Sequence, residues 1–318
     1  MATVLEYIKR KSRKIANRVR VDTTDFFSRW RTNVLFSEFY QPGTRERALC
    51  VFAHYSDENI IHDYVVYMVR EYKKAGCDVL FVSACGEGFS ILEFKKLDGL
   101  VVGAVLRANF GYDFGSWKTA YDLYQEMTEN YKAIIFANDS VYGPFSDLKP
   151  LISRVIDSEL DIWSLTDSYE RNYHYQSYFW GVGSNLARSA FFKEFWEKRF
   201  SYTSDRDKAI RLYELTLENW FVQERGMNGG VLYPLENLVE GQGGTLPLTR
   251  VNPMHHYGFL LLREFDFPFV KRELILSNLK GVRDVSDVLD IMRVKNEKVF
   301  SMSLEHLKSV GFEVAETK

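Results

Sequence analysis

From residue 48 onward, the chain alternates short apolar runs with segments of helical periodicity. The runs occupy residues 49–53, 79–84, 100–106, 133–137 and 162–165, and helical patterns fill 60–75, 116–129 and 146–158. Strands that are apolar on both faces need helices over both faces, as in a parallel sheet. The sequence therefore predicts an α/β fold of right-handed strand–helix–strand units, with a ligand at the carboxyl ends of the strands.

The pattern changes after residue 165. Helices are predicted over residues 190–199, 207–226, 272–280 and 285–294, and a strand over 229–235. Ser303 is predicted to be the N-cap of a last helix that runs through Lys308. Because no internal repeat or clear linker divides the chain, we predict a basic helical arm over residues 1–47 and one α/β domain over 48–318.

The composition excludes several classes of protein. Hydrophobic residues make up 46% of the chain and aromatic residues 15%, which rules out a disordered protein. The net charge of -2 gives no indication of nucleic-acid binding. Cys50, Cys77 and Cys85 lack metal-binding spacing and favour a reduced compartment. We expect neither a secretory signal nor a membrane span, because the apolar runs are too short.

The first 31 residues are strongly basic. They hold nine Lys and Arg residues against three acidic residues, and Val4, Ile8, Ile15 and Val19 recur at roughly helical spacing. This pattern predicts a basic amphipathic helix that attaches to an anionic membrane surface, with about 1 kcal/mol for each basic residue near the lipid. A helix packed on its own domain and a nucleic-acid-binding arm are the alternatives.

Several common catalytic motifs are missing. The chain has no Gly-x-x-x-x-Gly-Lys-[Ser/Thr] phosphate loop, no Gly-x-Gly-x-x-Gly after a strand, no Gly-x-Ser-x-Gly elbow, no Cys-x-x-Cys and no His-Glu-x-x-His. P-loop kinases, dehydrogenases, serine hydrolases and zinc enzymes of these types are therefore disfavoured.

Polar segments follow three of the predicted strands, at residues 54–58, 109–118 and 138–144. We therefore predict a donor site around His54, Asp113, Asn138 and Asp139. Asp113 would bind a ribose hydroxyl or a base edge, and Asp139 would bind a metal that bridges two phosphates. The alternatives are a tight turn around Asp113 and an Asx turn or helix cap at Asp139. A separate Asp-x-Asp pattern, 205–207, precedes a helix and is interpreted as a cap.

Four strings of residues carry a resemblance to a known family. They are NFGYDFGSWK at 109–118, NDSVYGP at 138–144, YHYQSYF at 173–179 and PFVKREL at 268–274. The chain resembles, over roughly residues 48–280, the rhamnan synthesis protein F family of bacterial glycosyltransferases for rhamnose-rich wall polysaccharides and O-antigens. Similar proteins are thought to transfer other sugars, including galactofuranose.

The resemblance implies a GT-A-like fold that binds a nucleotide sugar. Asp139 then lies where many such enzymes have a metal-binding Asp-x-Asp, so Mg²⁺ or Mn²⁺ is a possible cofactor. These enzymes often bring a late histidine onto the metal or the diphosphate, and His255 resembles that element. Lys271 and Arg272 could neutralise the diphosphate leaving group.

A second family spacing concerns the catalytic base. Many inverting GT-A enzymes have a Glu-Asp pair twelve residues before a glycine and a strand. Here Glu214 precedes Gly226 at that spacing, but Leu215 replaces the second acid. Glu214 or Glu218 is therefore predicted to be the general base, with Asp167 as the competing candidate. Ordinary solvated glutamates on a helix are the alternative.

An aromatic segment supplies the predicted acceptor surface. His174, Gln176 and Ser177 lie among tyrosines, as in sugar-binding surfaces, although His174 could equally be a core histidine.

Together, these features predict an inverting glycosyltransferase. The expected donor is dTDP-rhamnose or a UDP-sugar such as UDP-galactofuranose. The expected acceptor is a lipid-linked glycan at the inner face of the bacterial cytoplasmic membrane, and no nucleic acid is expected as a partner. The alternative is a non-catalytic glycan-binding or scaffolding subunit of the polysaccharide machinery.

Overall fold

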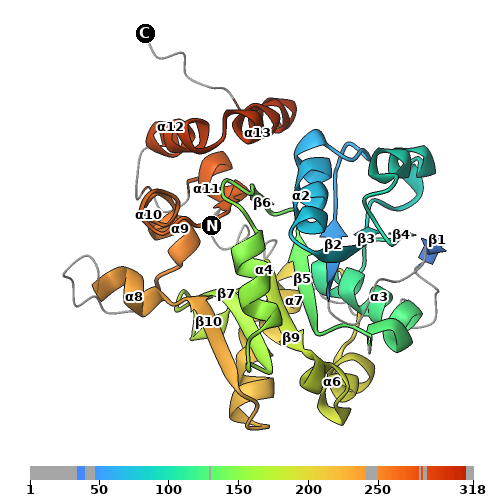
Figure 1. Ribbon diagram of the computed structural model, residues 1–318. Coiled ribbons are helices and arrows are strands. Elements are labelled where there is room, and N and C mark those ends of the chain that lie inside the picture. The colour runs from blue at the N-terminus through green and yellow to red at the C-terminus, as the bar shows by residue number, and fades with distance from the viewer. Residues whose placement is uncertain are drawn as a thin grey trace, which may run out of the picture.

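The protein is a mixed α/β molecule built around one large sheet (Figure 1). The computed structural model describes residues 34–39, 47–128, 130–240, 250–278, 281 and 285–312. Strand β1, Val34–Phe39, lies within the segment for which a helical arm is predicted. The residues that carry the basic helical pattern lie outside the described residues.

The central sheet is mostly parallel, with the order β1-β4-β3-β2-β5-β9-β7-β10. Strands β2, β3, β4 and β5 are mutually parallel, and β10 is parallel to β7. Strand β9 is antiparallel to both β5 and β7, and β1 is antiparallel to β4. The strands are β2 Ala48–His54, β3 Cys77–Ser83, β4 Gly103–Arg107, β5 Ala133–Asn138, β7 Ile162–Ser168, β9 Phe179–Gly183 and β10 Gly229–Tyr233. The α/β class is confirmed, and the architecture is consistent with a GT-A-like fold.

Helices cover both faces of the sheet, as expected for strands that are buried on both sides. Alternate residues of β2 point to opposite faces, so Cys50 and Phe52 belong to one core and Leu49 and Val51 to the other. The first core also takes residues from α2, Asp63–Lys74, and α4, Lys149–Ile156; the second takes residues from α3, Tyr112–Thr128. A short helix, η2 Ile91–Leu97, follows β3.

The segment from 206 to 226 differs from the single predicted helix. It forms α7, Arg206–Leu212, then η4, Glu214–Thr216, and a π-helical turn η5, Asn219–Gln223. Tyr213 lies at the first break, where its hydroxyl donates to Ser201 O at 2.6 Å and accepts from Ser201 N–H at 2.8 Å. This long-range contact, which periodicity does not reveal, accompanies the break.

The last predicted helix begins earlier than expected. Helix α13 spans Glu297–Ser309, and the side chain of Asn296 caps it by accepting from Val299 N–H at 3.2 Å. Ser303 is therefore not an N-cap. It is buried inside the helix and donates its hydroxyl to Val299 O at 2.7 Å.

Three predicted helices are present. The helix predicted over 190–199 forms as α6 Ala190–Glu194 and η3 Phe195–Arg199, the one over 272–280 begins as α11 Arg272–Leu276, and the one over 285–294 is α12 Val285–Lys295. The other elements were not predicted because they are short: η1 Gly86–Gly88, β6 Val141–Tyr142, β8 His174–Tyr175, α5 Ser184–Ala187, α8 Leu235–Glu240, α9 Pro253–His256, α10 Gly258–Glu264 and β11 Val270–Lys271. Strand β8 pairs with β7, and β11 pairs with β6.

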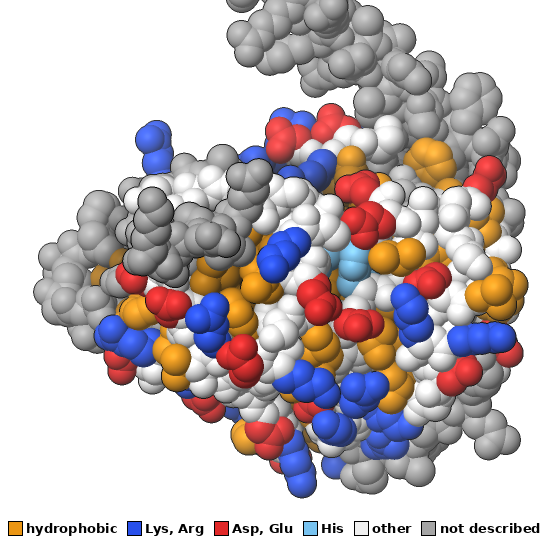
Figure 2. All heavy atoms as spheres, turned by 90° about the horizontal axis from the view of Figure 1, so that it is seen from above, with side chains coloured by type: hydrophobic (Ala, Val, Ile, Leu, Met, Phe, Trp, Pro, Cys, Tyr) orange, Lys and Arg blue, Asp and Glu red, His pale blue; other side chains and the backbone are white. Residues whose placement is uncertain are grey.

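The C-terminal helices α12 and α13 lie side by side at the top of Figure 1. From above, basic and acidic side chains are interspersed over most of the visible surface (Figure 2). Within the described ranges, no helix has the length and apolar character needed to cross a bilayer.

Candidate functional site

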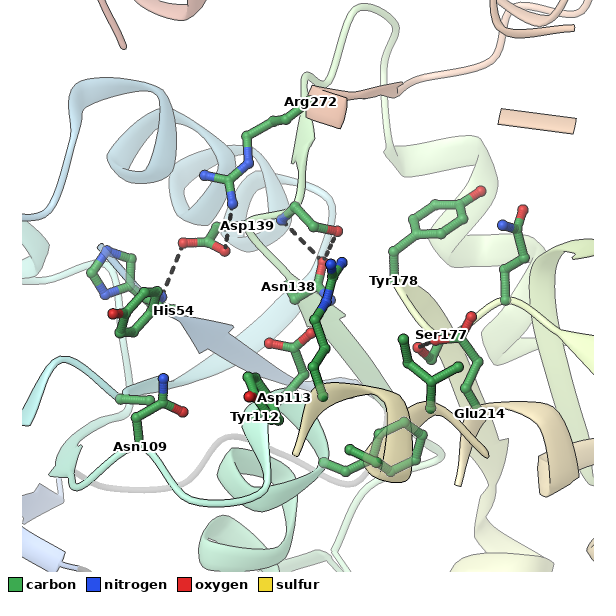
Figure 3. Close-up of a pocket in the computed structure, with 18 of the residues that line it drawn as sticks. His54, Asn109, Tyr112, Asp113, Asn138, Asp139, Ser177, Tyr178, Glu214 and Arg272 are labelled. Carbon is green, nitrogen blue, oxygen red and sulfur yellow. Dashed lines mark hydrogen bonds and ion pairs between the residues drawn. The ribbon is translucent and has the colours of Figure 1, made fainter. Parts of the chain in front are cut away.

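A cavity of about 680 Å³ opens at the carboxyl ends of the parallel strands. Its walls come from the segments that follow β2, β3, β4 and β5, from the segment that leads into β9, from α7 and η4, and from the junction of β11 with α11 (Figure 3). Parallel strands bring their carboxyl ends to one edge of the sheet, which places these distant segments around one hollow.

Asp113 is held at the cavity by an unusual turn. Gly111 and Tyr112 both have positive φ, +83° and +53°, and Asp113 follows them in the first turn of α3. Gly115 is required nearby, because a Cβ there would lie 2.1 Å from Phe110 O. The chain therefore presents the Asp113 carboxylate at the lip of the sheet.

Asn138 fixes this carboxylate from the end of β5. Its Nδ2 donates to Asp113 Oδ2 at 2.7 Å, and its Oδ1 accepts from Ser140 N–H at 3.1 Å and from Ser140 Oγ–H at 2.6 Å. Burial and, secondarily, the charge of Asp139 raise the pKa of Asp113 to about 6. Asp113 therefore changes its charge close to neutral pH.

Asp139 faces the guanidinium of Arg272, and both side chains line the cavity. Its Oδ2 accepts from Tyr55 N–H at 3.0 Å, and its Oδ1 lies 3.7 Å from Arg272 Nη2. Arg272 Nη1 donates to the hydroxyl of Tyr64 at 2.8 Å, which fixes the direction of the guanidinium. Figure 3 shows this pair beside His54.

His54 lies at the end of β2, next to Asp139. Its Nδ1 is 3.1 Å from Ser83 Oγ. Burial lowers the pKa of His54 to about 4, so the ring is neutral at neutral pH.

Lys271 reaches the cavity through a two-stranded ladder. Strand β11 pairs with β6 so that Lys271 lies opposite Val141, and its Nζ donates to Ser140 Oγ at 3.2 Å. The ammonium also lies 5.3 Å from the centre of the Tyr178 ring. Burial lowers the pKa of Lys271, while the carboxylates of Glu214 and Asp113 oppose that effect.

Glu214 lies on the opposite wall, at the start of η4. Its Oε2 accepts from Ser177 Oγ–H at 2.5 Å, and its Oε1 is 3.7 Å from His174 Nε2. A carboxylate that accepts a hydrogen bond from a hydroxyl, and that faces a cavity containing Lys271, is placed where it could take a proton from a hydroxyl bound in the cavity.

Nine of the predicted residues line the cavity together: His54, Asp113, Asn138, Asp139, Gln176, Ser177, Glu214, Lys271 and Arg272. Gln176 is held on both sides, because its Oε1 accepts from Thr166 Oγ1 at 2.7 Å and its Nε2 donates to Asn252 Oδ1 at 3.2 Å.

Four predicted residues do not line the cavity. Glu218 is buried and accepts from Gln223 Nε2 at 2.8 Å, within the π-helical turn. Asp167 accepts from Leu235 N–H at 2.8 Å. His174 lies behind Glu214, and His255 is buried in α9. In each case the fold turns the side chain toward a local partner or into the packed interior.

The residues present do not fit a metal site held by protein ligands alone. Asp139 and His255 do not meet at the cavity, and no group of three His, Cys, Asp or Glu residues suited to a metal ion occurs among the residues described. One Asp139 oxygen is hydrogen-bonded to Tyr55, and the other faces Arg272. These described residues therefore offer no complete set of protein ligands for the predicted divalent cation, whose binding stays a prediction.

Sequence reasoning did not identify several lining residues: Tyr55, Asn109, Tyr112, Ser140, Tyr178 and Arg206. The Asp-x-Asp pattern at 205–207 is indeed a helix cap, with Asp205 accepting from Lys208 N–H at 3.0 Å. The middle residue, Arg206, lines the cavity, and only the position of α7 reveals this.

Comparison with known proteins agrees with the motifs. The family described as rhamnan synthesis protein F matches residues 80–313. Virulence protein VirA of Vibrio anguillarum is 30% identical over 197 residues, which cover 55% of this chain and 62% of that protein. An uncharacterised Sinorhizobium fredii protein, y4gN, is 30% identical over 138 residues, 42% of this chain and 36% of that protein.

The chain thus spans less than two thirds of the length of these relatives. The family match, by contrast, extends over most of the chain and includes most of the segments that line the cavity, although β2 and residues 54–57 lie outside it. The protein therefore belongs to the family described as rhamnan synthesis protein F.

Proposed function

We propose that the protein is a glycosyltransferase that moves a sugar from a nucleoside diphosphate to a hydroxyl of a growing bacterial cell-surface polysaccharide. One observation carries the proposal: a single cavity is lined on one side by Glu214, a carboxylate that accepts a hydrogen bond from a hydroxyl, and on another side by Lys271 and Arg272. The first group suits an acceptor, and the second suits a departing diphosphate.

The proposed reaction begins at Glu214. The acceptor hydroxyl takes the place of the Ser177 hydroxyl or lies beside it, and gives its proton to the carboxylate. The acceptor oxygen then attacks the anomeric carbon from the side opposite the leaving phosphate, which inverts the configuration.

The leaving diphosphate is proposed to accumulate its charge against Lys271 and Arg272. Both are partly buried, and Tyr64 and Ser140 hold their charged ends in place. Preorganised cations in a partly desolvated site stabilise developing negative charge more strongly than mobile ones in water. Arg206, on the same lining, adds a third positive charge.

The donor nucleoside is proposed to lie against the ends of β2, β4 and β5, near His54, Asp113 and Asn138. The donors that fit the family are dTDP-rhamnose and UDP-sugars such as UDP-galactofuranose. A lipid-linked glycan is the proposed acceptor, and an anionic membrane surface is the proposed partner of the basic arm. Flotation of the full-length protein on anionic and neutral vesicles tests the last point.

A donor screen tests the function. Calorimetry with a panel of nucleotide sugars should find one that binds, and mass spectrometry should find the acceptor longer by one sugar. A protein that binds the glycan but turns over none of the donors would support the scaffolding alternative and contradict the proposal.

A further inference from the structure

His174 lies directly behind Glu214 and does not line the cavity. It belongs to β8, which pairs with β7 so that His174 lies opposite Ser168, and its side chain is only 5% exposed. Its position is therefore set by the sheet and not by contact with a substrate.

The backbone determines which nitrogen of this ring carries the proton. His174 Nδ1 lies 2.8 Å from the carbonyl oxygen of Asn172, and a carbonyl oxygen can only accept a hydrogen bond. Nδ1 must therefore be the donor. In the neutral ring, Nε2 then carries the free electron pair, and Nε2 is the atom that faces Glu214 Oε1 at 3.7 Å.

The two oxygens of Glu214 thus have different partners. Oε2 meets the hydroxyl of Ser177 on the cavity lining, and Oε1 meets the imidazole in the interior. Among the described residues, two further charged groups act on this pair: Lys271 on Glu214, and Asp167 of β7 on His174. A proton that enters at the cavity side of Glu214 therefore has a basic nitrogen on the far side.

We propose that His174 is the proton partner of Glu214, a positioning residue that receives the acceptor proton through the carboxylate. This inference rests on the proposed function. It assigns to His174 a role different from the acceptor binding that its sequence context predicts.

The acceptor O–H bond breaks and its proton goes to Glu214, while the acceptor oxygen bonds to the anomeric carbon. The bond from that carbon to the phosphate oxygen breaks, and its electron pair leaves with the diphosphate. The proton then passes from Glu214 Oε1 to His174 Nε2, which leaves a carboxylate and an imidazolium that later releases the proton to water.

The separation of 3.7 Å exceeds a hydrogen bond by less than 1 Å, and catalytic hydrogen bonds often tighten only when substrate binds. Imidazole is the side chain best suited to take and return a proton near neutral pH. Glutamine can fill much of the same space and hydrogen-bond to Glu214, but it cannot take the proton.

The test uses His174→Gln in the full-length protein, with His256→Gln as the matched control because His256 lies off the cavity lining. We expect His174→Gln to lower kcat about a hundredfold while the donor KM and donor affinity stay within about twofold. In the Glu214→Gln background, the same change should have no further effect. His256→Gln should keep wild-type kcat.

Nitrogen-15 spectra of histidine-labelled protein provide a readout that does not depend on activity. The His174 signals, identified by their loss in His174→Gln, should show a proton on Nδ1 and none on Nε2. A proton on Nε2, with or without one on Nδ1, would overturn the inference, and so would an unchanged kcat or a loss of donor binding equal to the loss of kcat. A wild-type protein without any transferase activity would instead overturn the proposed function itself, and this inference with it.

Discussion

Arg272 Nη2 lies 3.7 Å from Asp139 Oδ1, in a contact that joins the start of α11 to the residue that follows β5. The pair brings a late segment of the chain onto the edge of the sheet where the cavity opens. Because Tyr64 also holds the guanidinium, its charge stays at the cavity wall.

Arg272→Met should therefore weaken donor binding. Loss of a fixed cation that faces a diphosphate is expected to raise the donor Kd at least about tenfold, since a charge-assisted hydrogen bond contributes roughly 1.5–3 kcal/mol. Calorimetry measures the change. Arg263→Met is the control, because Arg263 is half exposed and pairs only with Glu264 among the ion pairs of the described chain. Equal donor affinity in wild type and Arg272→Met would remove Arg272 from the donor site.

Removal of divalent cations tests whether turnover requires a metal ion beside Asp139 and Arg272. Since the described residues do not fit a metal held by protein ligands, and Arg272 already faces Asp139, we expect turnover in excess EDTA to stay within about tenfold of the untreated rate. Turnover that stops in EDTA and returns with Mn²⁺ or Mg²⁺ would show that a metal completes the site.

The partly buried carboxyl of Asp113 makes stability depend on pH. Burial raises its pKa to about 6, above the value of an unfolded aspartate, so the folded state holds this proton more tightly. Its contribution to stability is complete below about pH 4 and is lost as the pH rises through 6. Asp113→Asn, which cannot ionise, should therefore gain stability relative to wild type between about pH 4.5 and pH 8.

Urea unfolding at those two pH values measures the free-energy difference between Asp113→Asn and wild type. Asp98→Asn serves as the control, because the side chain of Asp98 is exposed. A difference that stays constant with pH would contradict the assignment of a raised pKa to Asp113.

Arg107 holds the turn that presents Asp113. It is fully buried at the end of β4, donates to the carbonyl of Phe110, and donates to Ser116 Oγ at 3.0 Å. Arg107→Met leaves those acceptors without their donor, so we expect a loss of about 2–4 kcal/mol in the free energy of unfolding. Arg107→Lys keeps a charge but loses the planar guanidinium, so its free energy of unfolding should lie between those of wild type and Arg107→Met. Chemical denaturation measures both, and a loss below about 0.5 kcal/mol would contradict this role.

The first half of the fold could be predicted because its strands are buried on both faces. The runs at 49–53, 79–84 and 133–137 each lie within an observed strand, apart from the last residue of the second run, Ala84. Strand β9 was missed because it mixes aromatic residues with Gly181. That glycine is needed because a Cβ there would lie 2.3 Å from the Trp163 ring.

Part of the site could be predicted from strand ends, whereas Glu214 and Lys271 could be predicted only with the family resemblance. His54, Asp113 and Asp139 lie at or after the ends of the parallel strands β2, β4 and β5, so their meeting at one edge follows from a parallel sheet. Two predicted residues point away from the cavity because of contacts that residue spacing in the sequence does not reveal. Asp167 accepts a hydrogen bond from Leu235 N–H, and Glu218 accepts one from Gln223 in the π-helical turn. The pairing of β6 with β11, which brings Lys271 to Ser140, is likewise a long-range contact.

The central claim is that Glu214 removes the acceptor proton. The most direct test measures single-turnover rate and donor affinity for Glu214→Gln, which keeps the shape of the side chain but cannot take a proton. Glu218→Gln is the matched control, since that glutamate is buried away from the cavity. We predict that Glu214→Gln binds the donor as wild type does and loses about two to four orders of magnitude in rate, while Glu218→Gln stays near wild type. Near-normal transfer by Glu214→Gln would contradict the account.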